Sequence, residues 1–166
     1  MDSPIYAKVE PNKMLLNEMY KVINNETELK KFRNIVEKSL LVENLDFILA
    51  IDNYRKNSKK YFIEFSKQIN NKMKQDAYEY FKKFIEINSE QEVNISSSVR
   101  SRIVNQLDNW KDEATFCSLE TIQTILDNDE HHHINIFEKA YNEISIMLYQ
   151  NMWNKYLSEE IKNSMC

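Results

Sequence analysis

The chain contains no glycine in its 166 residues, and its only two prolines, Pro4 and Pro11, lie near the start. Doubly wound α/β folds use glycine in phosphate-binding turns, and β-hairpins use it where the backbone takes a positive φ. Helices joined by asparagine do without it, because asparagine tolerates the left-handed conformation at helix ends. The sequence holds 20 asparagines, enough to supply such joints. The composition therefore predicts an all-α domain.

Charge and hydropathy exclude several classes of protein. The net charge is −4 with acidic and basic residues interspersed, so no basic footprint for nucleic acid is present. No apolar run reaches the roughly 18 residues of a membrane span, and residues 1–13 lack the apolar core of a signal peptide. Cys117 and Cys166 are too few for a disulfide framework, which favours a reducing, cytoplasmic setting.

Apolar residues recur at helical spacing along most of the chain. We expect a polar tail over residues 1–12, a loop over 88–95 and an irregular stretch over 109–117. Thr27 is the expected N-cap of the second helix. Five methionines near aromatic residues are expected as core filler: Met14, Met19, Met73, Met147 and Met152. The predicted helices cover residues 14–23, 27–38, 42–56, 58–70, 73–87, 96–107, 118–126 and 131–162. This pattern amounts to about eight or nine helices around one core.

The residues that usually carry catalysis are not arranged for it. A chain without glycine has no phosphate loop and no nucleophile elbow. The two cysteines have no spacing for zinc, and His131, His132 and His133 would point about 100° apart on a helix, so we read the run as a polar helix start. We predict no metal, no cofactor and no catalytic residue.

Three stretches of the sequence form a pattern when taken together. The first contains FRNIV at residues 32–36, ENLDF at 43–47 and DNYRK at 52–56. The second contains residues 78–85, EVNI at 92–95 and Val99-Arg100. The third runs from Ile122 to Asp129. In order and interval, these stretches resemble the domain of the regulators of G-protein signalling, the RGS domain, over roughly residues 14–150.

The resemblance implies a two-lobed bundle of about nine α-helices over residues 13–160, between tails at 1–12 and 161–166. It also implies a partner, the GTP-bound α subunit (Gα) of a heterotrimeric G protein. The family is not itself enzymatic; it holds the switch segments of Gα in their transition-state arrangement and so accelerates GTP hydrolysis. We expect a cytoplasmic monomer, with recruitment to the inner face of the plasma membrane left open.

The resemblance further implies a binding surface built at three joints between helices. Asn94 matches the family's asparagine that reaches into the switch region of Gα. The side-chain amide suits that role, since it can donate and accept hydrogen bonds at once. Taken singly, Asn94 is a turn-former, Glu43 and Asn44 are first-turn helix residues, and Asp129 is a helix terminator; only their joint occurrence favours a binding surface. The implied residues are Leu40, Leu41, Glu43, Asn44, Glu92, Asn94, Ile125, Asp129 and His133.

The chain departs from the family pattern at three positions. Ile48 stands where tryptophan is usual, a core substitution that we expect the fold to accommodate. Leu40 stands where an aromatic residue is frequent. His133 stands where arginine is common, and if the histidine run is an insertion, Ile136 takes that position instead.

Three functional hypotheses follow from these residues: an active GTPase accelerator, an RGS-fold adaptor that binds a signalling partner without acceleration, and a helical bundle unrelated to G proteins. Asn94 together with Glu43 and Asn44 favours the first over the second. His133 favours the second.

Overall fold

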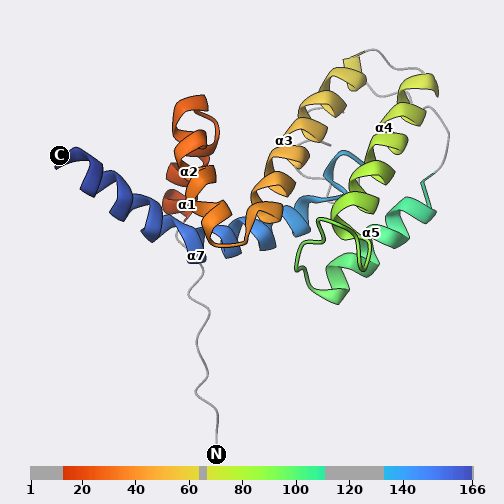
Figure 1. The fold of residues 1–166 in the computed structure, drawn as a ribbon. Coiled ribbons are helices and arrows are strands. Elements are labelled where there is room, and N and C mark those ends of the chain that lie inside the picture. Colours follow the sequence, from red (N-terminus) through yellow and green to blue (C-terminus); the bar gives the residue numbers. More distant parts are fainter. Residues whose placement is uncertain (1–12, 64–66, 111–132, 166) are drawn as a thin grey trace, which may run out of the picture. The chain divides into compact units, whose positions relative to one another are not determined.

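The computed structural model describes residues 13–63, 67–110 and 133–165, and all the regular structure in these residues is helical (Figure 1). The α-helices are α1 (Lys13–Ile23), α2 (Glu26–Lys38), α3 (Val42–Ile63), α4 (Lys67–Tyr80), α5 (Ser97–Asp108) and α7 (Glu138–Ser164). A π-helix, η1 (Phe81–Ile85), follows α4, and a 3₁₀-helix, η2 (His133–Asn135), precedes α7. The described ranges contain no strand, so the all-α prediction is confirmed.

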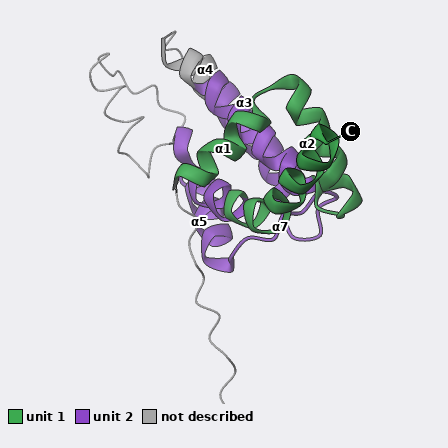
Figure 2. Ribbon diagram, turned by 90° about the vertical axis from the view of Figure 1, so that its left-hand side faces the viewer, with its two compact units in different colours: residues 1–42, 145–166 green, residues 43–144 purple. Residues whose placement is uncertain are grey.

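The chain divides into two compact units (Figure 2). Unit 1 comprises Met1–Val42 and Ser145–Cys166, and unit 2 comprises Glu43–Ile144. Unit 1 is therefore assembled from the two ends of the sequence, and α7 contributes residues to both units. The prediction of two subdomains is confirmed.

An aromatic cluster forms the core of unit 1. The buried ring of Phe32 on α2 lies 5.5 Å from that of Tyr156 and 6.5 Å from that of Trp153, both on α7. Tilted and edge-on pairs of this kind add about 0.5–1.5 kcal/mol beyond their buried area. The Tyr156 hydroxyl donates a 2.5 Å hydrogen bond to Glu28 Oε2, so α7 is fastened to α2 by both apolar and polar contacts.

Asparagine side chains close the joint between α1 and α2. Asn24 Nδ2 donates to the carbonyl of Tyr20 at 2.8 Å, and Asn25 Oδ1 accepts from the backbone N–H groups of Thr27 and Glu28 at 3.1 Å each. Asn25 is thus the N-cap of α2, and the prediction of Thr27 in that role is wrong. Asn25 has an extended backbone (φ −103°), so it caps through its side chain without a left-handed conformation.

The first half of α3 is buried on most of its circumference, as the spread of its apolar residues predicts. The Phe47 ring lies 5.6 Å from that of Phe84, and the Tyr54 ring lies 5.4 Å from that of Phe137. Ile48, where the family usually has tryptophan, is 0% exposed. Ile48 therefore occupies a core position, as expected.

Polar contacts fasten α3 to the start of α7 within unit 2. The Arg55 guanidinium pairs with Glu138 and lies 4.2 Å from the centroid of the Tyr141 ring. Burial raises the pKa of the neighbouring Asp52 carboxyl, and a hydrogen bond from Tyr141 and the charge of Arg55 oppose that rise. Asp52 and Arg55 are 3.9 Å apart.

Several predicted helix boundaries are wrong. A break after residue 56 was expected, yet α3 continues to Ile63 because asparagine alone costs a helix interior less than about 0.7 kcal/mol. The helix expected over 73–87 is α4 followed by the π-turn of η1. The helix expected over 131–162 begins only at Glu138 and reaches Ser164.

Met14, expected in the core, is 69% exposed, so that prediction is wrong. The loop predicted over 88–95 is confirmed as non-helical. The tail predicted over 1–12, the helix over 118–126 and most of the irregular stretch over 109–117 lie outside the described residues. The proposed domain limit at residue 160 stays a prediction.

Candidate functional site

The segment from Glu86 to Ser96, here called the 86–96 loop, is held against the core of unit 2. The backbone N–H of Val93 donates to the Phe84 carbonyl at 2.9 Å, and the Val93 side chain is fully buried. Two turns precede it, and Asn88 takes a left-handed conformation (φ 65°) that asparagine tolerates better than most residues. The loop therefore has a defined backbone path without any glycine.

Glu92 ties the loop to itself and to α5. Its Oε2 accepts from the backbone N–H of Asn88 at 2.8 Å, and its Oε1 accepts from Arg100 Nη2 at 2.9 Å. Both side chains are largely covered, which makes this ion pair stronger than a fully exposed one. The Glu92 carboxylate is consequently engaged within unit 2.

Asn94 is the exposed tip of the 86–96 loop. The N–H of Ile95 donates to the Val93 carbonyl at 3.1 Å, which closes a three-residue turn with Asn94 at its centre. Val93 and Ile95 on either side are buried, whereas the Asn94 side chain is exposed and makes no hydrogen bond to another described residue. The chain thus presents a free amide on a backbone that is anchored on both sides.

A second anchor holds the end of the loop. Glu143 on α7 accepts from the backbone N–H of Ser96 at 2.8 Å and from its hydroxyl at 2.7 Å. Ser96 is the N-cap of α5 by its extended backbone conformation, although its side chain makes no capping bond and turns to Glu143 instead. These contacts fix the loop to η1, α5 and α7 of unit 2.

The start of α3 lies beside this loop. Gln91 Nε2 donates to Asp46 Oδ2 at 3.3 Å, and the contact between Phe47 and Phe84 lies beneath it. Glu43 is partly exposed on the first turn of α3, but Asn44 is only 2% exposed. Within unit 2, the 86–96 loop and the first turns of α3 are thus in contact, and Asn44 is buried.

The link between α2 and α3, residues 39–41, belongs to unit 1. The N–H of Leu41 donates to the Val36 carbonyl at 3.3 Å, and that of Leu40 donates to the Glu37 carbonyl at 3.2 Å. This is the Schellman arrangement, which usually has glycine at the position that Leu40 occupies. Leu40 takes φ 55° there and is 84% exposed, while Leu41 is half-buried.

The third predicted joint comprises Ile125, Asp129 and His133. Ile125 and Asp129 lie outside the described residues, as do His131 and His132. His133 opens η2, and its side chain is also outside the description.

Sequence reasoning missed the residues that position the loop. Arg100 pairs with Glu92, Gln91 donates to Asp46 on α3, and Glu143 accepts from Ser96. None of these three positioning residues is among the predicted site residues. Arg100 stands within the quoted motif and so carried a weak signal. Glu143, 47 residues from its partner, could be found only in the folded chain.

The part of the chain that is described meets the requirements of neither a metal site nor a membrane span. It contains no group of three or more histidine, cysteine, aspartate or glutamate side chains that could hold a metal ion. None of its helices has both the length and the apolar character needed to cross a membrane.

A family model, that of the regulator of G protein signaling domain, matches residues 18–165, which is most of the chain. The chain therefore belongs to the RGS family. Among curated proteins, none matches it.

Proposed function

We propose that this RGS domain binds the GTP-bound α subunit of a heterotrimeric G protein and accelerates its GTP hydrolysis, which attenuates the signal. Gα already carries the glutamine that orients the attacking water and the arginine that stabilises the developing charge. A partner can therefore act by immobilising these groups, which needs rigidity and well-placed polar contacts more than a catalytic side chain.

The observation that supports the proposal most is the fixed presentation of Asn94. Its side chain is exposed, while the backbone on both sides is held by Val93, Ile95 and Ser96. An amide on an anchored turn loses less freedom on binding than one on a loose loop, so more of its hydrogen-bond energy remains as affinity. A loop with only a connecting role has no need of so many anchors.

The remaining predicted residues divide into contact residues and positioning residues. Glu43 on α3, and Leu40 with Leu41 on the preceding link, are proposed to contact Gα, as are Ile125, Asp129 and His133 at the third joint. Asn44 is buried and Glu92 is paired with Arg100, so we assign both to holding the surface in shape.

Single-turnover GTP hydrolysis by a panel of purified Gα proteins tests the proposal. We expect acceleration by the wild-type chain. Asn94→Ala should weaken the effect roughly 5- to 150-fold in affinity, because one interface hydrogen bond of about 1–3 kcal/mol is lost. Asn71→Ala is the matched control, since Asn71 is an exposed asparagine of α4 in the same unit.

The outcomes separate the hypotheses. Binding to Gα without acceleration would favour the adaptor, and neither binding nor acceleration with any Gα would overturn the proposal. If Asn94→Ala and Asn71→Ala behave alike, Asn94 has no part in the mechanism.

A further inference from the structure

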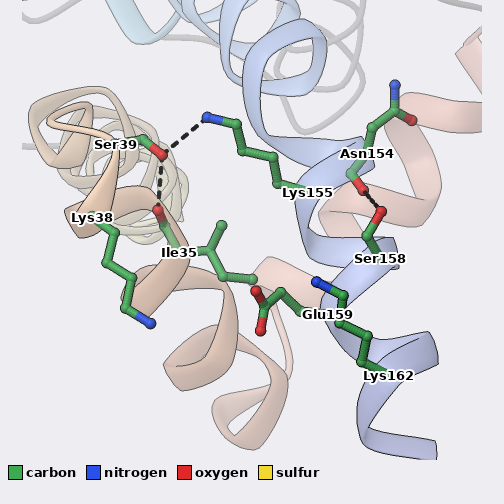
Figure 3. A pocket seen from close by; sticks show the side chains of 8 residues that line it. All are labelled: Ile35, Lys38, Ser39, Asn154, Lys155, Ser158, Glu159 and Lys162. Atoms are coloured by element: carbon green, nitrogen blue, oxygen red, sulfur yellow. Dashed lines mark hydrogen bonds between the residues drawn. The ribbon is translucent and has the colours of Figure 1, made fainter. Parts of the chain in front are cut away.

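A hollow of about 390 Å³ lies in unit 1, between the end of α2 and the second half of α7 (Figure 3). Three lysines line it: Lys38 at the end of α2, and Lys155 and Lys162 on α7. Glu159 is the only carboxylate in its lining, and none of the three lysines forms an ion pair with a described residue. The lining therefore has a local charge of +2, in a chain whose net charge is −4.

Lys155 is held in place across this hollow. Its ammonium group reaches from α7 to Ser39, where Nζ donates to the hydroxyl oxygen at 3.3 Å (Figure 3). The Ser39 hydroxyl in turn donates to the Ile35 carbonyl at 3.1 Å, so its orientation is fixed. An ammonium group has three N–H donors, and this contact uses one. The other two remain for an anionic ligand.

An apolar stripe follows the same part of α7. Leu157 and Ile161 are exposed and stand four residues apart, so they share one side of the helix, and Met165, exposed as well, follows directly after the end of α7. At 100° per residue this stripe lies about a quarter turn from the side that lines the hollow. Trp153 and Tyr156, on a third side, are buried in the unit 1 core. The end of α7 thus has a packed side, a basic side and an exposed apolar side.

We propose that this end of unit 1 docks on an anionic membrane surface, with the phosphate of a lipid headgroup in the lysine-lined hollow and the apolar stripe at the acyl boundary. Basic residues beside an apolar helix face are the features that bind such interfaces. A phosphate ligand free in solution would account for the lysines but would leave the stripe without a role. Because the chain as a whole is acidic, attraction to an anionic surface depends on a local group of lysines such as this one.

Vesicle co-sedimentation with the 1–166 chain tests the proposal, using phosphatidylcholine vesicles with and without phosphatidic acid. Binding should require phosphatidic acid. Replacing Lys38, Lys155 and Lys162 with glutamine should weaken it about fivefold per lysine, roughly a hundredfold in all. The control replaces Lys21, Lys30 and Lys56, which are exposed, lie outside the hollow and remove the same charge.

Two further variants separate the electrostatic and apolar contributions. Glu159→Gln removes the one negative charge of the lining and should strengthen vesicle binding about fivefold. Ile161→Ser should weaken vesicle binding roughly tenfold and leave binding of inorganic tripolyphosphate unchanged. Thermal melting of each variant verifies that it is folded.

Equal losses in the two lysine triples would overturn the proposal, because binding would then follow net charge alone. Binding of tripolyphosphate without binding of vesicles would also overturn it, in favour of a soluble phosphate ligand. The assay contains no G protein, so its failure is distinct from a failure of GTPase acceleration.

Discussion

Two joints of this molecule solve the same backbone problem in different ways. The α2–α3 link and the 86–96 loop each need one residue with positive φ, and the chain has no glycine for either. In the link, Leu40 both takes the left-handed conformation and forms the exposed tip. In the loop, Asn88 takes it, and the exposed tip is a separate residue, Asn94.

The difference shows how each tip is positioned. A left-handed leucine costs about 1–2 kcal/mol, whereas asparagine bears this conformation more easily. Leu40 is held there by the two Schellman hydrogen bonds, and an exposed apolar side chain kept at such a cost suggests a contact outside the chain. The 86–96 loop is free of that strain and relies on polar anchors.

The largest expected effect comes from the core beneath the loop. Phe84→Ala removes a buried ring and should lower the free energy of unfolding by about 3–5 kcal/mol. Phe32→Ala in unit 1 should cost a similar amount, as measured by urea denaturation. Only Phe84→Ala should also lower GTPase acceleration per folded molecule, because losing the ring that packs on Phe47 loosens η1, whose backbone carbonyl at residue 84 holds Val93. Equal losses of acceleration in both variants would contradict the distinction between the two regions.

The next effect concerns the ion pair that braces the loop. Arg100→Gln should lower stability by about 2 kcal/mol, because it leaves the largely covered Glu92 carboxylate without its charged partner. In a chain of this length that corresponds to a fall of roughly 4–8 °C in melting temperature. Lys82→Gln, at an exposed position of η1, serves as the control and should change the melting temperature little. Identical melting of the two variants would remove Arg100 as a brace.

A smaller effect of opposite sign is expected at the α2–α3 link. Leu40→Gly relieves the left-handed strain and should stabilise the chain by about 0.5–1 kcal/mol, after the entropy that glycine adds to the unfolded state is subtracted. Asn88→Gly should change the free energy of unfolding by only about a few tenths of a kcal/mol, since asparagine bears little strain in this conformation. Urea midpoints measure both. A less stable Leu40→Gly would contradict the assignment of strain to Leu40.

The smallest effects are pH-dependent and differ in sign between the units. In unit 1, the hydrogen bond from Tyr156, together with Lys31, lowers the pKa of the Glu28 carboxyl below its ordinary 4.5. The stability that the Glu28 carboxylate contributes is therefore present above pH 4.5 and is lost as pH falls through the folded pKa. Burial raises the pKa of Asp52 above 3.8, so its contribution is present below that value and lost as pH rises through the folded pKa.

Tyr156→Phe should therefore reduce the loss of stability in acid, whereas Asp52→Asn should reduce the loss as pH rises above about 4. Melting temperatures recorded from about pH 3 to pH 7 measure both slopes. Slopes that change in the same direction in the two variants would contradict the assignment.

Much of the fold and part of the site could be predicted from local sequence. The missing glycine, the helical periodicity and the EVNI and ENLDF motifs led to an all-α RGS domain and to Asn94 as a tip. The N-cap of α2 could not be predicted from local sequence. Asn25 and Thr27 are both good N-cap residues, and their two-residue separation gives no local reason to choose between them.

What the order of amino acids decided by itself was the class of structure, because glycine-free, periodic segments have few alternatives to helices. What only the tertiary structure decided was the function of each polar side chain. Asn44 and Asn94 are the same residue type in two motifs of one family, yet one is buried and the other is exposed. Glu143 reaches Ser96 only when the chain has folded, since burial and long-range hydrogen bonds depend on neighbours that are distant in sequence.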